Sequence, residues 1–473
     1  MKKVNKIRLL VLTLGAIAVS GSAHPASLLE IYQQALQGDP QIHEAEARRL
    51  AAFEAKPQAR GVLMPQISAT ADWNETNISG SSFSFINNAT TTFDQESTNT
   101  NWSVTLRQSL FRWDQIVNLK RADKTVAKAE AVREAAQQDL IVRVAQRYFD
   151  VLAAEDRLTS INADRTAIAR QLEQAKQRFD VGLIAITDVQ ESQAAYDQSV
   201  ANEIGAKRSL ATAREFLREI TGEYVSRLDA PGDDFPLLTP APNDEASWVD
   251  LSLSQNLNLV ASRLDERLAR DEISFRRNGY YPSLDLVVST GENTSEGDVF
   301  ASSPFGSGTS IFDDSSARDQ ISVQLTVPLF AGGATSSRVK EAVYLHRASR
   351  EQLQRVTRET ERQTRDAYLG VLSEISRVRA LKQAVASSHT ALQATQAGYE
   401  VGTRTIVEVL NSQFSLYVAI TNYYQSRYDY IMNALRLKQA AGSLQVQDLE
   451  QIDQWLKDRP TPEEAQAESA ERS

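Results

Sequence analysis

Two short segments of the chain place similar polar side chains around a glycine. Residues 178–190 read RFDVGLIAITDVQ, and residues 398–410 read GYEVGTRTIVEVL. Each segment has an aromatic residue, an acid, Val and Gly, and then a second acid followed by Val. The second segment differs by Tyr399 in place of a phenylalanine and by Arg404 in place of an isoleucine. A phenol hydroxyl and a guanidinium both hydrogen-bond to carboxylates and hydroxyls, so the second segment can make polar contacts that the first cannot.

The glycines of these segments, Gly182 and Gly402, interrupt two long helical runs. Glycine adopts left-handed backbone angles that other residues avoid, and such a residue commonly ends a helix. Another helical run follows each glycine within a few residues. The pattern therefore predicts two helical hairpins, with hinges at residues 179–186 and 399–406.

The other reactive side chains form no catalytic or metal-binding pattern. The four histidines are scattered, and His43-Glu44 lacks the second histidine of an HExxH zinc motif. The absence of cysteine excludes thiolate metal sites, Fe–S clusters and disulfides. Gly332-Gly333 is not followed by the Lys-Ser/Thr of a phosphate-binding loop. We therefore expect no enzymatic activity, no cofactor and no structural metal.

The first residues have the pattern of a secretory signal peptide. Four basic residues precede an apolar run at 9–19, and the small residues Gly-Ser-Ala follow at 21–23. The apolar run is about half of the ~20 residues that a membrane-spanning helix needs. The net charge of −10 argues against nucleic acid and anionic lipid headgroups as main partners. We expect a secreted or cell-envelope protein.

Much of the chain is repeated internally. The segment VAQRYFDVLAAEDRL at 144–158 aligns with TRDAYLGVLSEISRV at 364–378, at the same offset as the two hinge glycines. Each half reads as helix, strand pair, long helix, hinge and long helix. The predicted organisation is, in order, a signal peptide at 1–23, a first repeat at 24–222, a proline-rich connector at 223–246, a second repeat at 247–442, and a C-terminal segment with a disordered tail at 443–473.

The longest helical segments are rich in good helix formers. Residues 114–178 contain neither proline nor glycine, and residues 336–397 contain one glycine. Either segment would form a helix of roughly 100 Å. Apolar residues recur at spacings of three and four, which suits helices packed side by side. These helices alone are equally compatible with a generic soluble coiled coil.

Two pairs of short segments alternate between apolar and polar residues, as amphipathic strands do. They are 66–77 with 101–110 and 282–290 with 320–329, and the Ser-, Asn- and Gly-rich segments 78–100 and 291–318 are predicted to be long loops. Strands of about ten residues can cross a bilayer when tilted, and aromatic residues lie near the strand ends, as in membrane barrels. An amphipathic hairpin on a soluble helical domain is the alternative.

Four strands cannot close into a membrane barrel. Open sheet edges in lipid would leave backbone groups unpaired at a cost of several kcal/mol each, and the smallest bacterial barrels have about eight strands. A barrel therefore requires several copies of the chain. A dimer and a trimer both meet this requirement.

Several long motifs resemble the TolC family of outer-membrane channels over nearly the whole mature chain. They are RFDVGLIAITDVQ with the following YDQSVANEIGAKRSL, then VGTRTIVEVL, YPSLDLVVSTG and PLFAGG. The resemblance implies a mainly helical homotrimer, whose strands form one β-barrel in the outer membrane of a Gram-negative bacterium and whose helices form a long periplasmic tunnel. The connector and the C-terminal segment would form a belt around this tunnel.

The resemblance also implies a function. Such channels are passive exit ducts for multidrug efflux, type I protein secretion or both. A periplasmic adaptor protein and an inner-membrane transporter of the RND, ABC or MFS type engage them at the periplasmic end, where the helical hairpins untwist to open. Two other classes remain open on the residues alone, a periplasmic coiled-coil adaptor and an envelope structural protein. The cargo cannot be chosen from the sequence.

By the same resemblance, a gate latch lies beside the hinges. The family's tyrosine and arginine, here Tyr399 and Arg404, bond to the positions occupied by Asp188, Thr187 and Gln177. We therefore expect these five residues to hold the periplasmic end closed.

Two acidic rings can stand just inside the entrance of such channels, where they bind cations. The matching residues are Glu408 and Asn411, so one ring keeps its carboxylates and the other is neutral. We expect weaker cation selectivity and weaker block by multivalent cations than in a homologue with two acidic rings.

Overall fold

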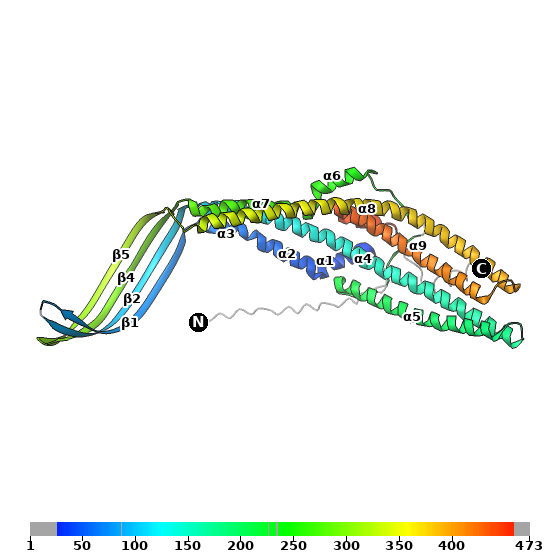
Figure 1. Cartoon of the computed structure of the whole chain (residues 1–473), viewed down its shortest axis with the longest axis horizontal. Coiled ribbons are helices and arrows are strands. Elements are labelled where there is room, and N and C mark those ends of the chain that lie inside the picture. The colour runs from blue at the N-terminus through cyan, green and yellow to red at the C-terminus, as the bar shows by residue number, and fades with distance from the viewer. Residues whose placement is uncertain (1–25, 87, 226, 233–234, 458–473) are drawn as a thin grey trace, which may run out of the picture.

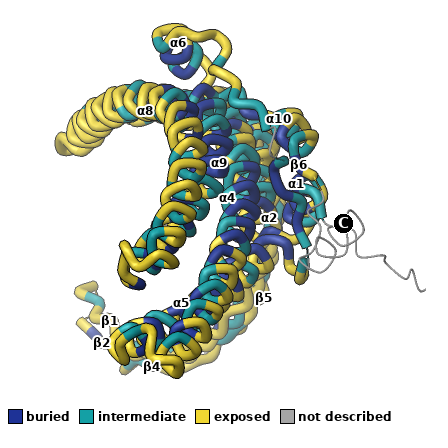
Figure 2. Tube along the Cα trace, turned by 90° about the vertical axis from the view of Figure 1, so that its right-hand side faces the viewer, coloured by how far each residue is buried: buried dark blue, intermediate teal, exposed yellow. Residues whose placement is uncertain are grey.

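The computed structural model describes residues 26–86, 88–225, 227–232 and 235–457. The signal peptide predicted at 1–23 and the predicted disordered tail beyond residue 457 lie outside this part. The protein is mainly helical, with a small sheet at one end of an elongated molecule and the two hinges at the other end (Figure 1). The helices between these ends lie side by side in a curved layer (Figure 2).

Four long helices form most of the molecule. They are α4 (Trp113–Asp180), α5 (Ile186–Thr221), α8 (Ala334–Glu400) and α9 (Ile406–Ala441). The pair α4/α5 and the pair α8/α9 are each an antiparallel hairpin, and their lengths match closely at 68 and 36 residues against 67 and 36. Helices of this length are stable because they pack against one another, and α4 contacts both α5 and α9.

Shorter helices continue the long ones toward the sheet or surround their middle. They are α1 (Leu28–Gly38), α2 (Pro40–Phe53), α3 (Ala55–Gly61), α6 (Glu245–Gln255), α7 (Leu257–Arg276), the 3₁₀ helix η1 (Arg277–Tyr280) and α10 (Val446–Asp453). Around the middle, the two-residue strands β3 (Ala230–Pro231) and β6 (Leu456–Lys457) pair with each other and join the connector to the C-terminal segment. Lys124 and Lys128 of α4 form ion pairs with Asp271 and Asp265 of α7, which fix these helices to each other.

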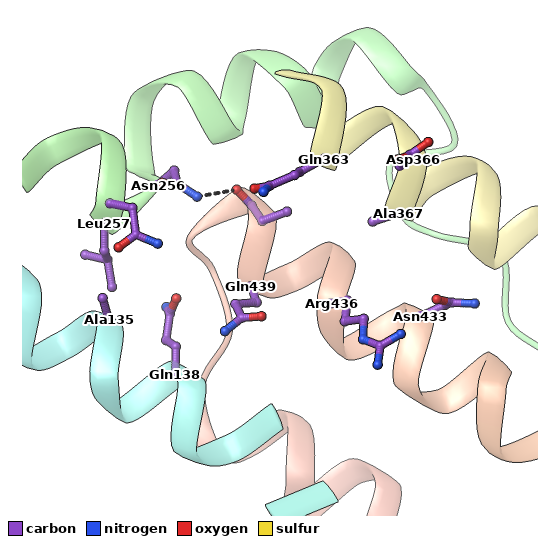
Figure 3. Close-up of a pocket in the computed structure, with 12 residues that line it drawn as sticks. Ala135, Gln138, Asn256, Leu257, Gln363, Asp366, Ala367, Asn433, Arg436 and Gln439 are labelled. Atoms are coloured by element: carbon purple, nitrogen blue, oxygen red, sulfur yellow. Dashed lines mark hydrogen bonds between the residues drawn. The ribbon is translucent and has the colours of Figure 1, made fainter. Parts of the chain in front are cut away.

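The end of α9 abuts the start of α7. A Cβ atom added to Gly442 would lie 2.3 Å from the backbone oxygen of Gln255, so only glycine fits there. Asn256 Nδ2 donates to the backbone oxygen of Ala440 at 2.9 Å, which the dashed line in Figure 3 marks. The carbonyl end of α9 is thus capped by Asn256, the N-cap residue that precedes α7.

The sheet is antiparallel, in the order β1-β2-β4-β5. Its strands are β1 (Gln66–Ser84), β2 (Ala89–Phe111), β4 (Ser283–Ser303) and β5 (Gly306–Thr326). They are about twice as long as the sequence predicted, because most of the predicted loops at 78–100 and 291–318 is strand, and β5 ends before residues 327–329. Alternation detects only strand segments with one apolar face, whereas pairing of the backbones also orders polar segments.

The apolar core lies in the middle of the molecule, where both hairpins meet α1, the connector and α10. Leu140, Tyr148 and Phe149 of α4 are at most 1% exposed, as are Ile431 and Leu435 of α9. Tyr148 Oη donates to the backbone oxygen of Asp229 at 2.7 Å, which fastens the connector to this core. The two hairpins therefore extend from this packed core toward the hinges.

Candidate functional site

Both hinges have the same backbone geometry. Gly182 and Gly402 have φ angles of 76° and 77°, in the left-handed region that favours glycine. After each glycine the chain folds back on the helix that it leaves, since Leu183 N donates to Arg178 O and Thr403 N donates to Gly398 O, both at 2.8 Å. These bonds satisfy carbonyls at the helix end in the manner of a Schellman motif.

The helix after the second hinge begins with a capping box. Thr405 Oγ1 accepts from Glu408 N, and the Glu408 carboxylate accepts from Thr405 N at 2.8 Å. Arg404 Nη1 also donates to Glu408, at 2.8 Å. The N–H of Thr405, and then the guanidinium of Arg404, hold the pKa of the Glu408 carboxyl below its usual range. Glu408 is therefore ionised at neutral pH and neutralised in part by its neighbour.

In the part of a single chain that the structure describes, the five predicted latch residues do not all meet. Arg404 pairs with Glu408, while Thr187 donates to the adjacent Asp188 at 3.5 Å and Gln177 donates to Glu173. Each of these contacts stays within its own hairpin. The latch therefore stays a prediction about neighbouring hairpins in an assembly.

Tyr399 does make a contact with the other hairpin. The guanidinium of Arg178, in the last turn of α4, lies 5.0 Å from the centre of the Tyr399 ring. A cation over a phenol ring is attracted to its face. This pair joins the tips of α4 and α8 within one chain. The sequence gives no signal for Arg178, because its partner Tyr399 lies more than 200 residues away.

A second contact between the hairpins lies two to three turns from the hinge, at Gln413 of α9. Its amide nitrogen donates to Asp164 Oδ1 at 2.8 Å, and its amide oxygen accepts from Gln171 Nε2 at 2.8 Å. Gln413 is 1% exposed. A sequence signal was available, because Gln413 interrupts the apolar spacing of Ile406, Val409 and Leu416 in α9.

The two predicted ring residues lie on successive turns of α9. Glu408 is half-buried, and Asn411 is exposed. A separation of three residues places both side chains on one side of the helix. Their carboxylate and amide thus face similar surroundings, and only one of the two carries charge.

The remaining features of the described part concern metal ligands, membrane spans and one pocket. Its residues contain no group of three His, Asp or Glu side chains that could hold a metal ion. None of the helices described is long and apolar enough to traverse a bilayer. A pocket of about 410 Å³ lies where α9 meets α7, lined largely by amides such as Gln138 and Gln439 (Figure 3). Gln138 caps the backbone oxygens of Gly442 and Leu444, so this site serves the helix junction.

The sequence matches the family model described as outer membrane efflux protein, over residues 31–223 and 248–443. It is 37% identical to the outer membrane protein TolC of Vibrio cholerae over 441 residues, which cover 93% of this chain and 96% of the relative. It is also 28% identical to the alkaline protease secretion protein AprF of Pseudomonas aeruginosa, covering 91% of this chain and 87% of that protein.

The fold is similar to that of solved outer-membrane proteins. The crystal structure of VceC from Vibrio cholerae superposes with a TM-score of 0.68 at 19% identity, over 88% of this chain and 96% of that one. At this level of identity the match supports the fold alone.

Proposed function

Because the chain belongs to the outer membrane efflux protein family, we propose that it forms the passive outer-membrane exit duct of a transport system. The protein is an outer-membrane protein with an extended periplasmic helical part, and its relatives are channels for efflux and secretion rather than enzymes. The observation that carries the proposal is the elongated fold, with a sheet at one end and two matched helical hairpins at the other.

We propose that three copies complete the channel. The sheet has two open edges, β1 and β5, whose backbone groups would be unpaired in lipid. Pairing β5 of one copy with β1 of the next would remove every edge, and three copies would give a barrel of ordinary bacterial size. The helices would then continue the barrel as a tunnel.

The hinge tips suit a protein partner. Val181 and Leu183 of the first hinge are 69 and 73% exposed, and Val401 of the second is 76% exposed. Exposed apolar side chains of this kind suit contact with another protein. We propose that a periplasmic adaptor contacts these tips and couples the channel to an energised inner-membrane transporter of the RND, ABC or MFS type.

The hinge polar groups would close the tunnel. In the trimer, hairpins of neighbouring copies meet, and Tyr399 and Arg404 could then reach Asp188, Thr187 and Gln177. Opening would follow when the hairpins untwist and these bonds exchange with water. The exposure of Arg404, Thr187 and Gln177 in one chain supports this, because their donors and acceptors are accessible to a neighbour.

The names of the relatives indicate only the class of cargo. Two relatives are named for the secretion of proteases, and another is an outer membrane efflux protein. We propose that this duct serves efflux, protein secretion or both, according to the transporter engaged. Deleting the gene and profiling antibiotic sensitivity together with secreted proteins would separate these roles.

The function is tested by fractionation and reconstitution. A channel is expected as a heat-modifiable trimer in the outer-membrane fraction that conducts ions in planar bilayers. A soluble periplasmic monomer would overturn the proposal and favour the adaptor class. Outer-membrane trimers without any conductance would favour an envelope structural protein.

A further inference from the structure

A column of polar contacts joins α4 to the α8/α9 hairpin between the apolar core and the hinges. In order along α4, the contacts are Asp156 with Tyr428, Asp164 with Gln413, Gln171 with Gln413, and Arg178 with Tyr399. The α4 members recur every seven or eight residues, about two helical turns, so they share one face of the helix. The interface between the hairpins therefore changes from apolar in the core to polar toward the hinges.

Gln413 is the most buried member of this column toward the hinge. It occupies a position of an apolar stripe, between Val409 and Leu416, at 1% exposure. Its amide makes three hydrogen bonds to α4, with the Asp164 carboxylate, the Asp164 backbone oxygen and Gln171. A polar residue at such a position costs stability and specifies one arrangement of the helices.

We infer that Gln413 is a positioning residue of the gate: with Asp164 and Gln171 it forms a polar node at which α9 parts from α4 when the channel opens, while the apolar core stays packed. This inference rests on the proposed function and names the place within each chain where the movement occurs.

The node can part because water replaces its contacts. Hydrogen bonds between side chains exchange with bonds to water at a small net cost, whereas separation of apolar surfaces has no such compensation. Gln171 Oε1 is also buried without a hydrogen-bond partner among the residues that the structure describes. Parting of the helices would open this acceptor to water.

The negative charge of Asp164 favours separation of α4 and α9 at the node. Its side chain is half-buried, and burial raises the pKa of its carboxyl against the opposing hydrogen bond from Gln413. A carboxylate in this position is better solvated once the helices separate. Removing its charge while keeping an acceptor for Gln413 should therefore hold the node closed.

The test measures the open fraction of the full-length wild-type channel and of three variants in planar bilayers. Gln413→Met keeps the volume but removes all three bonds, so the polar groups of Asp164 and Gln171 lose their partner while the helices stay in contact and regain one, water, only when they part. Because a buried polar group without a partner costs more free energy than the added apolar contact returns, the open fraction should rise about two- to tenfold. Gln425→Met is the matched control on the same helix, since Gln425 is exposed and bonds only within α9, to Asp429; it should behave as wild type.

Asp164→Asn is the decisive second variant, because it should lower the open fraction below that of the wild type. A general loosening of the structure could not produce this opposite change. Equal open fractions for Gln413→Met and Gln425→Met in intact trimers would overturn the inference, as would increased opening of Asp164→Asn. A wild-type trimer that never conducts would instead overturn the proposed function, and this inference with it.

Discussion

At the scale of single residues, the side chains near the second hinge have competing partners. Arg404 pairs with Glu408 in one chain, yet the resemblance predicts that it belongs to the latch. The two roles are compatible if Arg404 exchanges partners when hairpins of neighbouring copies meet. Glu408 would then be released to face the channel as a ring of carboxylates.

The latch can be tested by removing its second-hairpin groups. Tyr399→Phe combined with Arg404→Ser should raise single-channel conductance and admit large antibiotics, because the hydroxyl and the guanidinium are lost. Tyr344→Phe with Arg355→Ser is the matched control, since Arg355 forms the same type of ion pair with Glu359 on α8, away from the hinge. Unchanged conductance of the first pair in assembled trimers would count against the latch.

The pore ring can be tested in both directions. Glu408→Gln should weaken block by multivalent cations, because it removes the ring's charge, and Asn411→Asp should strengthen it by adding a second ring. Block is measured as the cation concentration that halves the current in planar bilayers. Equal block of the wild type and Glu408→Gln would remove this role for Glu408.

Acid should favour the closed node. Because burial raises the Asp164 pKa in the closed arrangement, the closed state binds this proton more tightly than the hydrated one. Closure therefore gains stability as pH falls from the raised pKa toward about 4, the ordinary value for aspartate, and loses it as pH rises. Tyr417 also lies within the electrostatic influence of Asp164 and Arg170, and it stays neutral because burial raises its pKa.

This pH dependence is measured as the open fraction of the wild type and Asp164→Asn across the acidic range. Other carboxylates titrate in both proteins, so only the difference between the two curves reports on Asp164. Parallel curves would show that Asp164 does not couple to opening.

At the scale of elements, the hinges require glycine because of its backbone conformation, and not because a larger side chain would lack space. Gly402 has a positive φ with nothing within 4 Å of an added Cβ, and Gly205 in α5 has equally open surroundings without a positive φ. Gly402→Ala should destabilise the hairpin by about 1–2 kcal/mol through left-handed strain. Gly205→Ala should stabilise the helix by about 0.5–1 kcal/mol.

Urea unfolding followed by circular dichroism compares the two alanine variants directly. Both changes add one methyl group in open space, so a difference in sign isolates the backbone term. Equal shifts of the two midpoints would contradict the assignment of the hinge to glycine's conformational freedom.

At the scale of the whole molecule, assembly can be tested because the chain has no cysteine of its own. Ala71→Cys on β1, combined with single cysteines scanned along 313–321 of β5, should give disulfide-linked trimers at alternate positions in one register. The same scan along 288–296 of β4 is the control, since β4 lies inside the sheet between β2 and β5. Absence of linked trimers along all of β5, on non-reducing gels, would contradict closure through these edges.

Local sequence composition is enough to predict the elements that interactions within the same segment stabilise. Runs without proline predict the long helices. Glycines predict the left-handed turns, because other residues adopt that conformation only at a cost in free energy. The strands were recognised only where one face is apolar, and their polar halves were read as loops, because pairing with a neighbouring strand orders those residues whatever their side chains.

The sequence by itself thus determined a mainly helical chain with a small sheet, and long motifs placed it in its family. Only the tertiary structure decided which side chains meet across the hairpins. Gln413 and Asp164 lie 249 residues apart in the sequence, whereas Arg404 and Glu408 lie only four residues apart on a single turn. Sequence spacing reports contacts within one helix, whereas a contact between distant segments depends on how whole helices pack, so the polar node could not be read from the residues alone.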